Sequence, residues 1–287
     1  MSEQRRLIGF MQSRKISDAP EMIRSLIDTL DLHDRSWVAH VDDEDIPRET
    51  LQSTAFIVTA GGDGTILRVN RLVSPYSIPI VGINMGRVGF MAELTVENAA
   101  ERLSQYLAGD VRTEERLMLQ AEVTAQSNGE TRIVDHALNE AIVRGTLPRL
   151  LDVEVTIDGV RLATYRADGV IVSTPTGSTG YALSAGGPVL QPESKVLLVQ
   201  PLAAHISLQT GLVVPDNCTV ELAVVGNREA LISVDNLTNA TLHPNDKVVI
   251  RKSPHIASFL RADPPSAFYS TLTQRLGVSH RTSYDEH

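Results

Sequence analysis

Short apolar runs alternate with helical patterns over roughly the first hundred residues of the chain. Runs typical of strands lie at 7–11, 37–41, 55–60 and 78–83. The runs at 55–60 and 78–83 contain no charged residue, as expected for strands that are buried on both faces of a parallel sheet. Apolar residues recur with helical spacing after Pro20, after Thr65 and from Val96 to Leu107. This alternation predicts an α/β layer with a parallel sheet.

The pattern changes at about residue 111, where strand-like stretches follow one another with few helical segments. These stretches lie at 117–125, 131–143, 151–157, 160–165, 169–173, 195–199, 212–214, 219–225, 230–234 and 247–251. We therefore predict two domains, an α/β domain at 1–110 and a β-rich domain at 111–278. We expect 268–276 to form a terminal helix that packs back on the first domain, and 279–287 to be a disordered tail.

Composition narrows the classes of protein that fit this pattern. The chain of 287 residues has 26 Lys and Arg against 35 Asp and Glu, a net charge of −9, which argues against a nucleic-acid coat or a basic membrane patch. A single cysteine, Cys218, excludes an internal disulfide framework and a thiolate metal cluster. No apolar run approaches the ~20 residues of a membrane span, and the first residues lack a signal sequence. We expect a soluble cytoplasmic protein.

The segment Gly61-Gly62-Asp63-Gly64-Thr65 lies between a predicted buried strand and a predicted helix. Glycines let the backbone approach a ligand closely, and the N–H groups at a helix start attract anions. A carboxylate in such an anion site is repelled by phosphates unless it binds Mg²⁺ or takes a proton from a nucleophile. Asp63 is therefore the most informative residue of the chain. The structural alternative is a tight turn in which Asp63 caps the helix.

Two further glycine-rich segments follow predicted strands. The segment from Gly82 to Phe90 comes at the end of a predicted buried strand and contains three glycines. It fits either a ligand-binding rim, with Phe90 as its apolar wall, or an ordinary loop. From Asp168 to Pro188, a strand runs into a cluster of hydroxyls and glycines. Such a cluster presents backbone amides and hydroxyls without bulky side chains, as a polyphosphate or a ribose requires. Tyr181 adds a flat face for a base.

Other motifs are less informative. Asn139-Glu140 follows a predicted strand and suits recognition of a ribose diol, although a strand end with a solvated Glu140 fits as well. The acidic run Asp42-Asp43-Glu44-Asp45 is more typical of a solvated loop than of a metal cluster. The histidines lack metal-ligand spacing, and neither a Gly-x-Ser-x-Gly elbow nor a Walker A motif is present.

Together these segments resemble the NAD kinase family, which phosphorylates the adenosine ribose 2′-hydroxyl of NAD to form NADP. The resemblance rests on the order and spacing of Gly61–Thr65, Gly82–Phe90, Asn139-Glu140 and Asp168–Pro188, and spans roughly residues 5 to 277. It implies an α/β N-terminal domain with a Rossmann-like parallel sheet, a β-rich C-terminal domain and a site in the cleft between them. It also implies a homodimer or homotetramer and no nucleic-acid or membrane partner.

The resemblance implies a set of site residues. Asp63 would be the catalytic residue, and Asp63, Gly64, Arg68, Phe90, Asn139, Glu140, Arg149, Arg166, Asp168, Thr179, Gly180, Tyr181, Ala182, Leu183, Ser184, Ala203 and Asn236 would bind NAD. The phosphate-donor loops would contain Gly61, Gly62, Gly64, Thr65, Thr176, Gly177 and Ser178. Arg68 would either assist there or lie on the solvated face of its helix. Arg149 would serve this site or that of a neighbouring subunit.

The implied reaction transfers the terminal phosphoryl group of ATP, or of another polyphosphate, to NAD while Asp63 orients and deprotonates the hydroxyl. Mg²⁺ or another divalent cation would accompany the donor, without a metal site fixed by protein side chains alone. The chain departs from the family at Gly180, at Ala204–Leu208 and at Asp235-Asn236-Leu237. Two alternatives stay open: a lipid kinase of the diacylglycerol or sphingosine type, and a non-catalytic NAD(H)-binding regulator.

Overall fold

The computed structural model describes residues 7–43, 46–86, 89–147, 149–205 and 210–277. By contacts the chain divides into two compact units. The first unit takes in the chain up to Val69, Ile78–Glu114 and the chain from Phe259 onward, and the second takes in Asn70–Ser77 and Glu115–Ser258. The expected tail at 279–287 lies outside the described residues, as do Glu44-Asp45, Arg87-Val88 and 206–209. No helix in the described ranges is long and apolar enough to cross a membrane.

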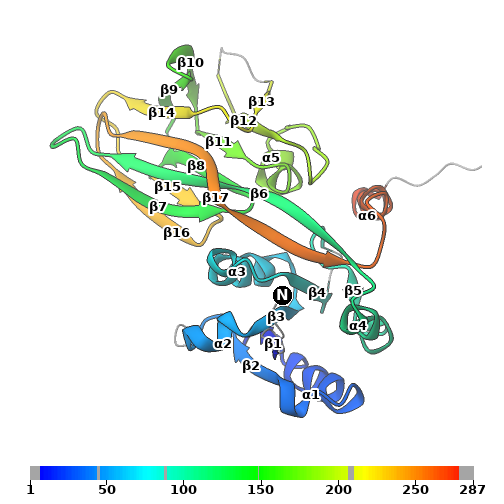
Figure 1. The fold of residues 1–287 in the computed structure, drawn as a ribbon. Coiled ribbons are helices and arrows are strands. Elements are labelled where there is room, and N and C mark those ends of the chain that lie inside the picture. The colour runs from blue at the N-terminus through cyan, green and yellow to red at the C-terminus, as the bar shows by residue number, and fades with distance from the viewer. Residues whose placement is uncertain (1–6, 44–45, 87–88, 148, 206–209, 278–287) are drawn as a thin grey trace, which may run out of the picture. The chain divides into compact units, whose positions relative to one another are not determined.

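A parallel sheet forms the centre of the first unit (Figure 1). Its strands lie in the order β2 (Ser36–His40), β1 (Leu7–Gln12), β3 (Thr54–Gly61), β4 (Ile80–Asn84) and β5 (Leu94–Thr95). The helices of this unit are α1 (Ala19–Thr29), α2 (Arg48–Gln52), the first part of α3 (Asp63–Val73), α4 (Ala99–Ala108) and α6 (Ala267–Leu276). The predicted α/β layer with a parallel sheet is confirmed.

Apolar side chains of this sheet pack against the helices. Phe10, Val58 and Val81 are fully buried and form one cluster with Ile23 of α1 and Leu103 of α4. The apolar residues of α1 and α4 recur at helical spacing, and each helix buries that side while its polar residues stay exposed. The cluster therefore fixes the strands whose carboxyl ends carry the glycine-rich segments.

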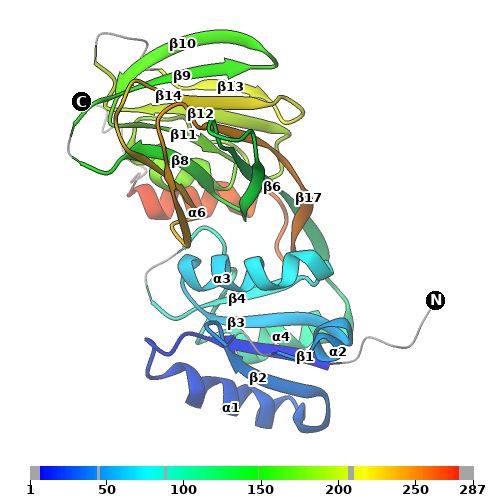
Figure 2. The ribbon, with the colours of Figure 1, turned by 90° about the vertical axis from the view of Figure 1, so that its left-hand side faces the viewer.

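Two antiparallel sheets form the second unit (Figure 2). One contains β10 (Val160–Ala167), β9 (Leu151–Ile157), β14 (Val220–Val225), β17 (Lys247–Arg261), β6 (Arg112–Thr124) and β7 (Thr131–Ala137). The other has the order β13 (Leu212–Pro215), β12 (Val196–Leu202), β11 (Gly169–Ser173), β8 (Glu140–Gly145), β15 (Ala230–Val234) and β16 (Thr238–Leu242). The expected β-rich character of the second domain is confirmed.

Alternate residues of β8 and β11 face two different apolar clusters. Val143 and Val172 pack with Val153 and Leu222 of the other sheet. Ile142 and Ile171 face the opposite side, where they pack with Ala182 of the short helix α5 (Tyr181–Ser184). Because side chains alternate along a strand, the second sheet is buried on both faces and α5 covers one of them.

The structure corrects two of the predicted elements and also shows a strand that was not predicted. The single strand expected at 131–143 is two strands, β7 and β8, because the backbone N–H groups of residues 138–140 bind the Asp235 carboxylate and leave the ladder. The strand expected at 247–251 continues to Arg261 as β17, through the polar stretch that its pattern had suggested as an end. The strand β16 was not predicted, because only Ala240 and Leu242 of it are apolar.

Candidate functional site

Asp63 lies where the central strand β3 gives way to α3. The strand ends at Gly61, where a side chain would overlap that of Thr65, and Asp63 is the first residue of the helix. Its carboxylate accepts hydrogen bonds from the backbone N–H groups of Phe90 (2.9 Å) and Met91 (3.2 Å), in the segment after β4. The carboxylate is thus held by a neighbouring segment, which differs from the helix-capping alternative.

A glycine makes this position of Asp63 possible. A Cβ atom at Gly89 would overlap a carboxylate oxygen of Asp63, so only glycine lets the two segments approach this closely. At Gly62 and Gly64, by contrast, a Cβ atom would meet nothing within 4 Å. The backbone on either side of Asp63 is therefore open, as a loop that receives a ligand requires.

Arg275, in the last turn of α6, reaches the same carboxylate. Its Nη1 lies 3.2 Å from Oδ2 of Asp63, and its guanidinium carbon lies 4.5 Å from the ring centroid of Phe90. Both charged side chains keep solvent contact, with exposed fractions of 26% for Asp63 and 38% for Arg275. Arg275 was not predicted as a site residue, because a basic residue in the last turn of a helix is common wherever it faces solvent.

Arg68 is held in an ion pair on α3. Its Nη1 lies 2.7 Å from Oδ1 of Asp42, in the acidic loop that follows β2. Asp43 of the same loop is paired with Arg14. Arg68 was expected either to assist at the site or to lie on the solvated face of its helix. Its observed partner is Asp42 and not Asp63.

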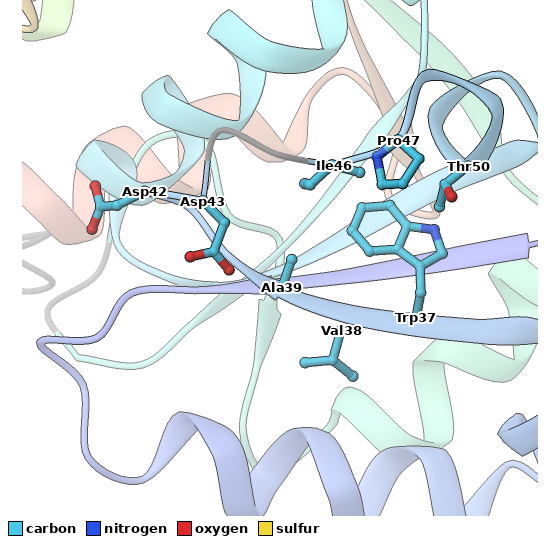
Figure 3. A pocket seen from close by; sticks show the side chains of 8 residues that line it. All are labelled: Trp37, Val38, Ala39, Asp42, Asp43, Ile46, Pro47 and Thr50. Carbon is cyan, nitrogen blue, oxygen red and sulfur yellow. The ribbon is translucent and has the colours of Figure 1, made fainter.

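The loop after β2 also lines a pocket of about 590 Å³ at the edge strand of the sheet (Figure 3). It is lined by Trp37, Val38, Ala39, Asp42, Asp43, Ile46, Pro47 and Thr50. None of the predicted site residues is among them. Figure 3 shows Trp37, Ile46, Pro47 and Thr50 on one side and the two carboxylates on the other.

The predicted residues of the second unit lie at the two ends of β11. Residue pairing puts Ser173 opposite Glu140 at one end and Gly169 opposite Arg144 at the other. The first end holds Asn139, Glu140, Thr176, Gly177, Ser178, Thr179, Gly180, Tyr181, Ala182, Leu183, Ser184 and Asn236. The second holds Arg149, Arg166, Asp168 and Ala203. The sequence-distant predicted residues thus form two groups within this unit and a third around Asp63 in the first unit.

Backbone contacts fix the second of these ends. The N–H of Asp168 donates to the carbonyl of Leu202, and the N–H of His205 donates to the carbonyl of Arg166. Ala203 lies between these bonds in a left-handed conformation, with φ of 46°. Arg149 lines a separate hollow of about 380 Å³ together with Arg228 and Leu147.

Hydroxyl groups in the loop after β11 bind backbone carbonyls of the loop itself or of the segment before β8. Thr174 Oγ1 donates to the carbonyl of Leu138 (2.6 Å), and Ser178 Oγ donates to the carbonyl of Pro175 (2.6 Å). Gly177 packs so closely on the carbonyl of Asn139 that a side chain there would overlap it. Only the buried hydroxyl of Thr176 has no partner within the described residues. The density of small residues thus also serves the close packing of the loop on Asn139.

Glu140 and Asp235 form a buried acidic pair beneath this loop. The Asp235 carboxylate accepts from the N–H groups of Leu138 (2.7 Å), Asn139 (2.8 Å) and Glu140 (3.0 Å). Burial raises the pKa of Asp235 to about 6 against the opposing effect of these donors, so it is ionised at neutral pH. Burial, with the nearby charge of Asp235, raises the pKa of Glu140 to about 8. Asp235 was not predicted as a site residue, because the sequence of its turn does not indicate which backbone N–H groups its carboxylate binds.

Comparison with known proteins decides the family. The chain matches the model of the ATP-NAD kinase N-terminal domain over residues 15–111 and that of the ATP-NAD kinase C-terminal domain over 138–262. It is 41% identical to an NAD kinase of Dehalococcoides mccartyi strain CBDB1 over 82% of this chain and 83% of the relative. The chain belongs to the ATP-NAD kinase family.

Other members of the ATP-NAD kinase family agree with this assignment. An NAD kinase of Chloroflexus aggregans is 39% identical over 77% of this chain and 79% of its own. A crystal structure of an NAD kinase from Archaeoglobus fulgidus in complex with ATP matches with a TM-score of 0.74 and 27% identity, covering 95% of this chain and all (100%) of that one. Yeast NADH kinase complexed with NADH shares the fold, with a TM-score of 0.85 at 19% identity over 99% of this chain and 91% of that chain.

The two domain models cover all of the predicted site residues of this ATP-NAD kinase family member. Asp63 and Phe90 lie within the N-terminal match, and Asn139, Glu140 and Asn236 lie within the C-terminal match. Helix α6, which carries Arg275, lies beyond both matched ranges.

Proposed function

We propose that this chain transfers the terminal phosphoryl group of ATP, or of another polyphosphate donor, to the 2′-hydroxyl of the adenosine ribose of NAD, giving NADP. Membership of the ATP-NAD kinase family supports the two substrates. The observation that carries the chemistry is the partly exposed carboxylate of Asp63, fixed by two backbone N–H groups at the start of a helix with open glycine backbone on both sides.

In this proposal Asp63 orients the hydroxyl and accepts its proton as the oxygen attacks the phosphorus. Oδ1 accepts one hydrogen bond, from Met91, and keeps a free lone pair, whereas Oδ2 accepts from both Phe90 and Arg275. Phosphoryl transfer depends mainly on positioning and charge neutralisation, and a carboxylate held in one orientation provides the first. The open backbone at Gly62 and Gly64 would bind donor phosphates through N–H groups, and the neighbouring Gly61 and Thr65 would belong to the same donor loop.

The second unit would bind the dinucleotide. Asn139 and Glu140 would bind ribose hydroxyls, and residues 179–184 would hold the adenine end. Thr176 supports a role for the loop, since its buried hydroxyl has no protein partner among the described residues and a buried polar group without a partner calls for an explanation. The roles of Arg68, Arg149, Arg166, Asp168, Ala203 and Asn236 belong to the same proposal, as does the domain division near residue 110.

A divalent cation, Mg²⁺ or another, fits this proposal as a companion of the donor. In the described ranges no three or more His, Cys, Asp or Glu side chains are grouped so that they could hold a metal ion. Mg²⁺ is often bound by one or two carboxylates with substrate phosphates and water, and Asp63 is such a carboxylate. When bound, the cation would offset charge on the donor phosphates. We further propose a homodimer or homotetramer.

Replacing Asp63 by Asn tests the proposal, because it keeps the size of the side chain and removes the base. We expect Asp63→Asn to retain NAD binding and to lower kcat by about 100-fold or more. The assay incubates the protein with NAD, ATP and Mg²⁺ and measures NADP. Asp110→Asn, at an exposed position, is the matched control and should keep wild-type turnover.

The same assay separates the alternatives. NADP formation by the wild type excludes a regulator that only binds NAD(H). Tight NAD binding without any NADP would favour the regulator, and transfer to an acylated alcohol in place of NAD would favour a lipid kinase. Near-normal turnover by Asp63→Asn would remove Asp63 from its proposed role.

A further inference from the structure

The proposed reaction creates a conflict of charge at Asp63. The donor carries several negative charges and must come close to a carboxylate. A cation supplied by the protein at that point would reduce the repulsion before the donor arrives. Net charge does not provide it, because the chain as a whole carries −9.

Arg275 is a cation in that position. Its Nη1 lies 3.2 Å from Oδ2 of Asp63, and both residues belong to the first unit. The guanidinium group has five N–H donors, of which the structure assigns one to Asp63. With 38% of the side chain exposed, the other donors are accessible to a ligand that reaches Asp63.

Phe90 fixes the orientation of this guanidinium group. The Arg275 guanidinium carbon lies 4.5 Å from the centroid of the Phe90 ring, in a cation–π contact. The backbone N–H of Phe90 in turn donates to the same Oδ2 of Asp63. One residue therefore positions both the carboxylate and the cation, which lowers the entropic cost of ordering a long side chain when a ligand binds.

We propose that Arg275 is a donor-binding residue, whose guanidinium group beside Asp63 and over Phe90 binds a terminal phosphoryl oxygen of the polyphosphate donor. The inference rests on the proposed function of Asp63. Guanidinium is suited to this task because its planar set of donors matches phosphate oxygens. Helix α6 then becomes part of the donor site, although it lies outside both matched domain models.

Binding of inorganic tripolyphosphate tests this inference without turnover. Isothermal titration calorimetry compares the wild type with Arg275→Ala and Arg275→Lys. We expect the Kd to rise about 10-fold or more for Arg275→Ala, because a charge-assisted hydrogen bond is lost, and to rise less for Arg275→Lys. Gln274→Ala, an exposed neighbour on α6, is the control and should bind like the wild type.

Steady-state kinetics provide the second measurement. For Arg275→Ala we expect the KM for ATP to rise about 10-fold or more while the KM for NAD stays within about twofold, a split that a merely structural role of α6 would not produce.

An unchanged tripolyphosphate Kd, or a wild type that does not bind tripolyphosphate, overturns the inference. A raised kcat with unchanged KM for ATP also overturns it, because Arg275 would then block Asp63. A wild type that binds tripolyphosphate but forms no NADP contradicts the proposed function and leaves the binding result to decide on Arg275.

Discussion

At the scale of single residues, burial determines what Glu140 can offer to a ligand. Its side chain is 8% exposed, and its Oε2 has no hydrogen-bond partner within the described residues. Burial and the charge of Asp235 raise the pKa of Glu140 to about 8, so the carboxyl group is protonated at pH 7. A neutral carboxyl group can donate one hydrogen bond and accept another, which suits a sugar hydroxyl.

The protonated state of Glu140 predicts the pH dependence of NAD binding. We expect NAD affinity to fall as pH rises through 8 in the wild type, and Glu140→Gln to keep its affinity and lose this dependence. Folding raises the pKa of Glu140 from 4.5 to about 8. The neutral carboxyl group therefore contributes stability that is fully present below pH 4.5 and is lost as pH rises through 8. Calorimetric Kd values from pH 6.5 to 9 check this, with Glu221→Gln as control. A wild type with a flat profile would contradict it.

At the scale of elements, apolar runs predicted most strands, but not where they end. The buried strands β3 and β4 and the turn at Asp158-Gly159 follow from local pattern alone. The break between β7 and β8 does not, since the side chain that causes it, Asp235, is 95 residues beyond Glu140 in the chain. Likewise Asp63 was found by its glycines, whereas Arg275, 212 residues beyond it, has no local motif. The local sequence pattern of a segment therefore does not predict its contacts with distant segments.

Through the hydrogen bonds of Asp235, the turn between β15 and β16 therefore holds the start of β8 in place. In Asp235→Asn the amide nitrogen would replace one carboxylate oxygen, so either Leu138 or the pair Asn139 and Glu140 would face a second donor. We expect this variant to lose about 1–3 kcal/mol of unfolding free energy, Asp235→Ala to lose more, and both to raise the KM for NAD. Urea unfolding and kinetics measure the two effects, with the exposed Asn239→Ala as control. If Asp235→Asn had the stability of the wild type, the hydrogen bonds of Asp235 would not contribute to the free energy of unfolding.

At the scale of the whole molecule, each unit has a large apolar core of its own. One contains Phe10, Val58 and Leu103, all in the first unit, and the other contains Val143, Val172 and Leu222, all in the second. The boundary between the units falls inside β6 and β17, which continue from one unit into the other without a break in the strand. The net charge of −9 is compatible with binding two polyanions, because backbone N–H groups and single arginines do not require a positive total.

The two cores predict that unfolding can be followed in each unit by a different probe. Trp37, the single tryptophan, lies in the first unit, where its indole N–H donates to Thr54, while pulsed hydrogen exchange read by mass spectrometry follows the backbone amides of β8, β11 and β15 in the second. Leu103→Ala and Leu222→Ala each delete a fully buried side chain and should cost about 2–5 kcal/mol, several degrees in Tm. We expect Leu103→Ala to lower the fluorescence midpoint more than the exchange midpoint of the second unit, and Leu222→Ala to do the reverse. Equal shifts of both probes in both variants would mean that the two cores unfold as one cooperative unit.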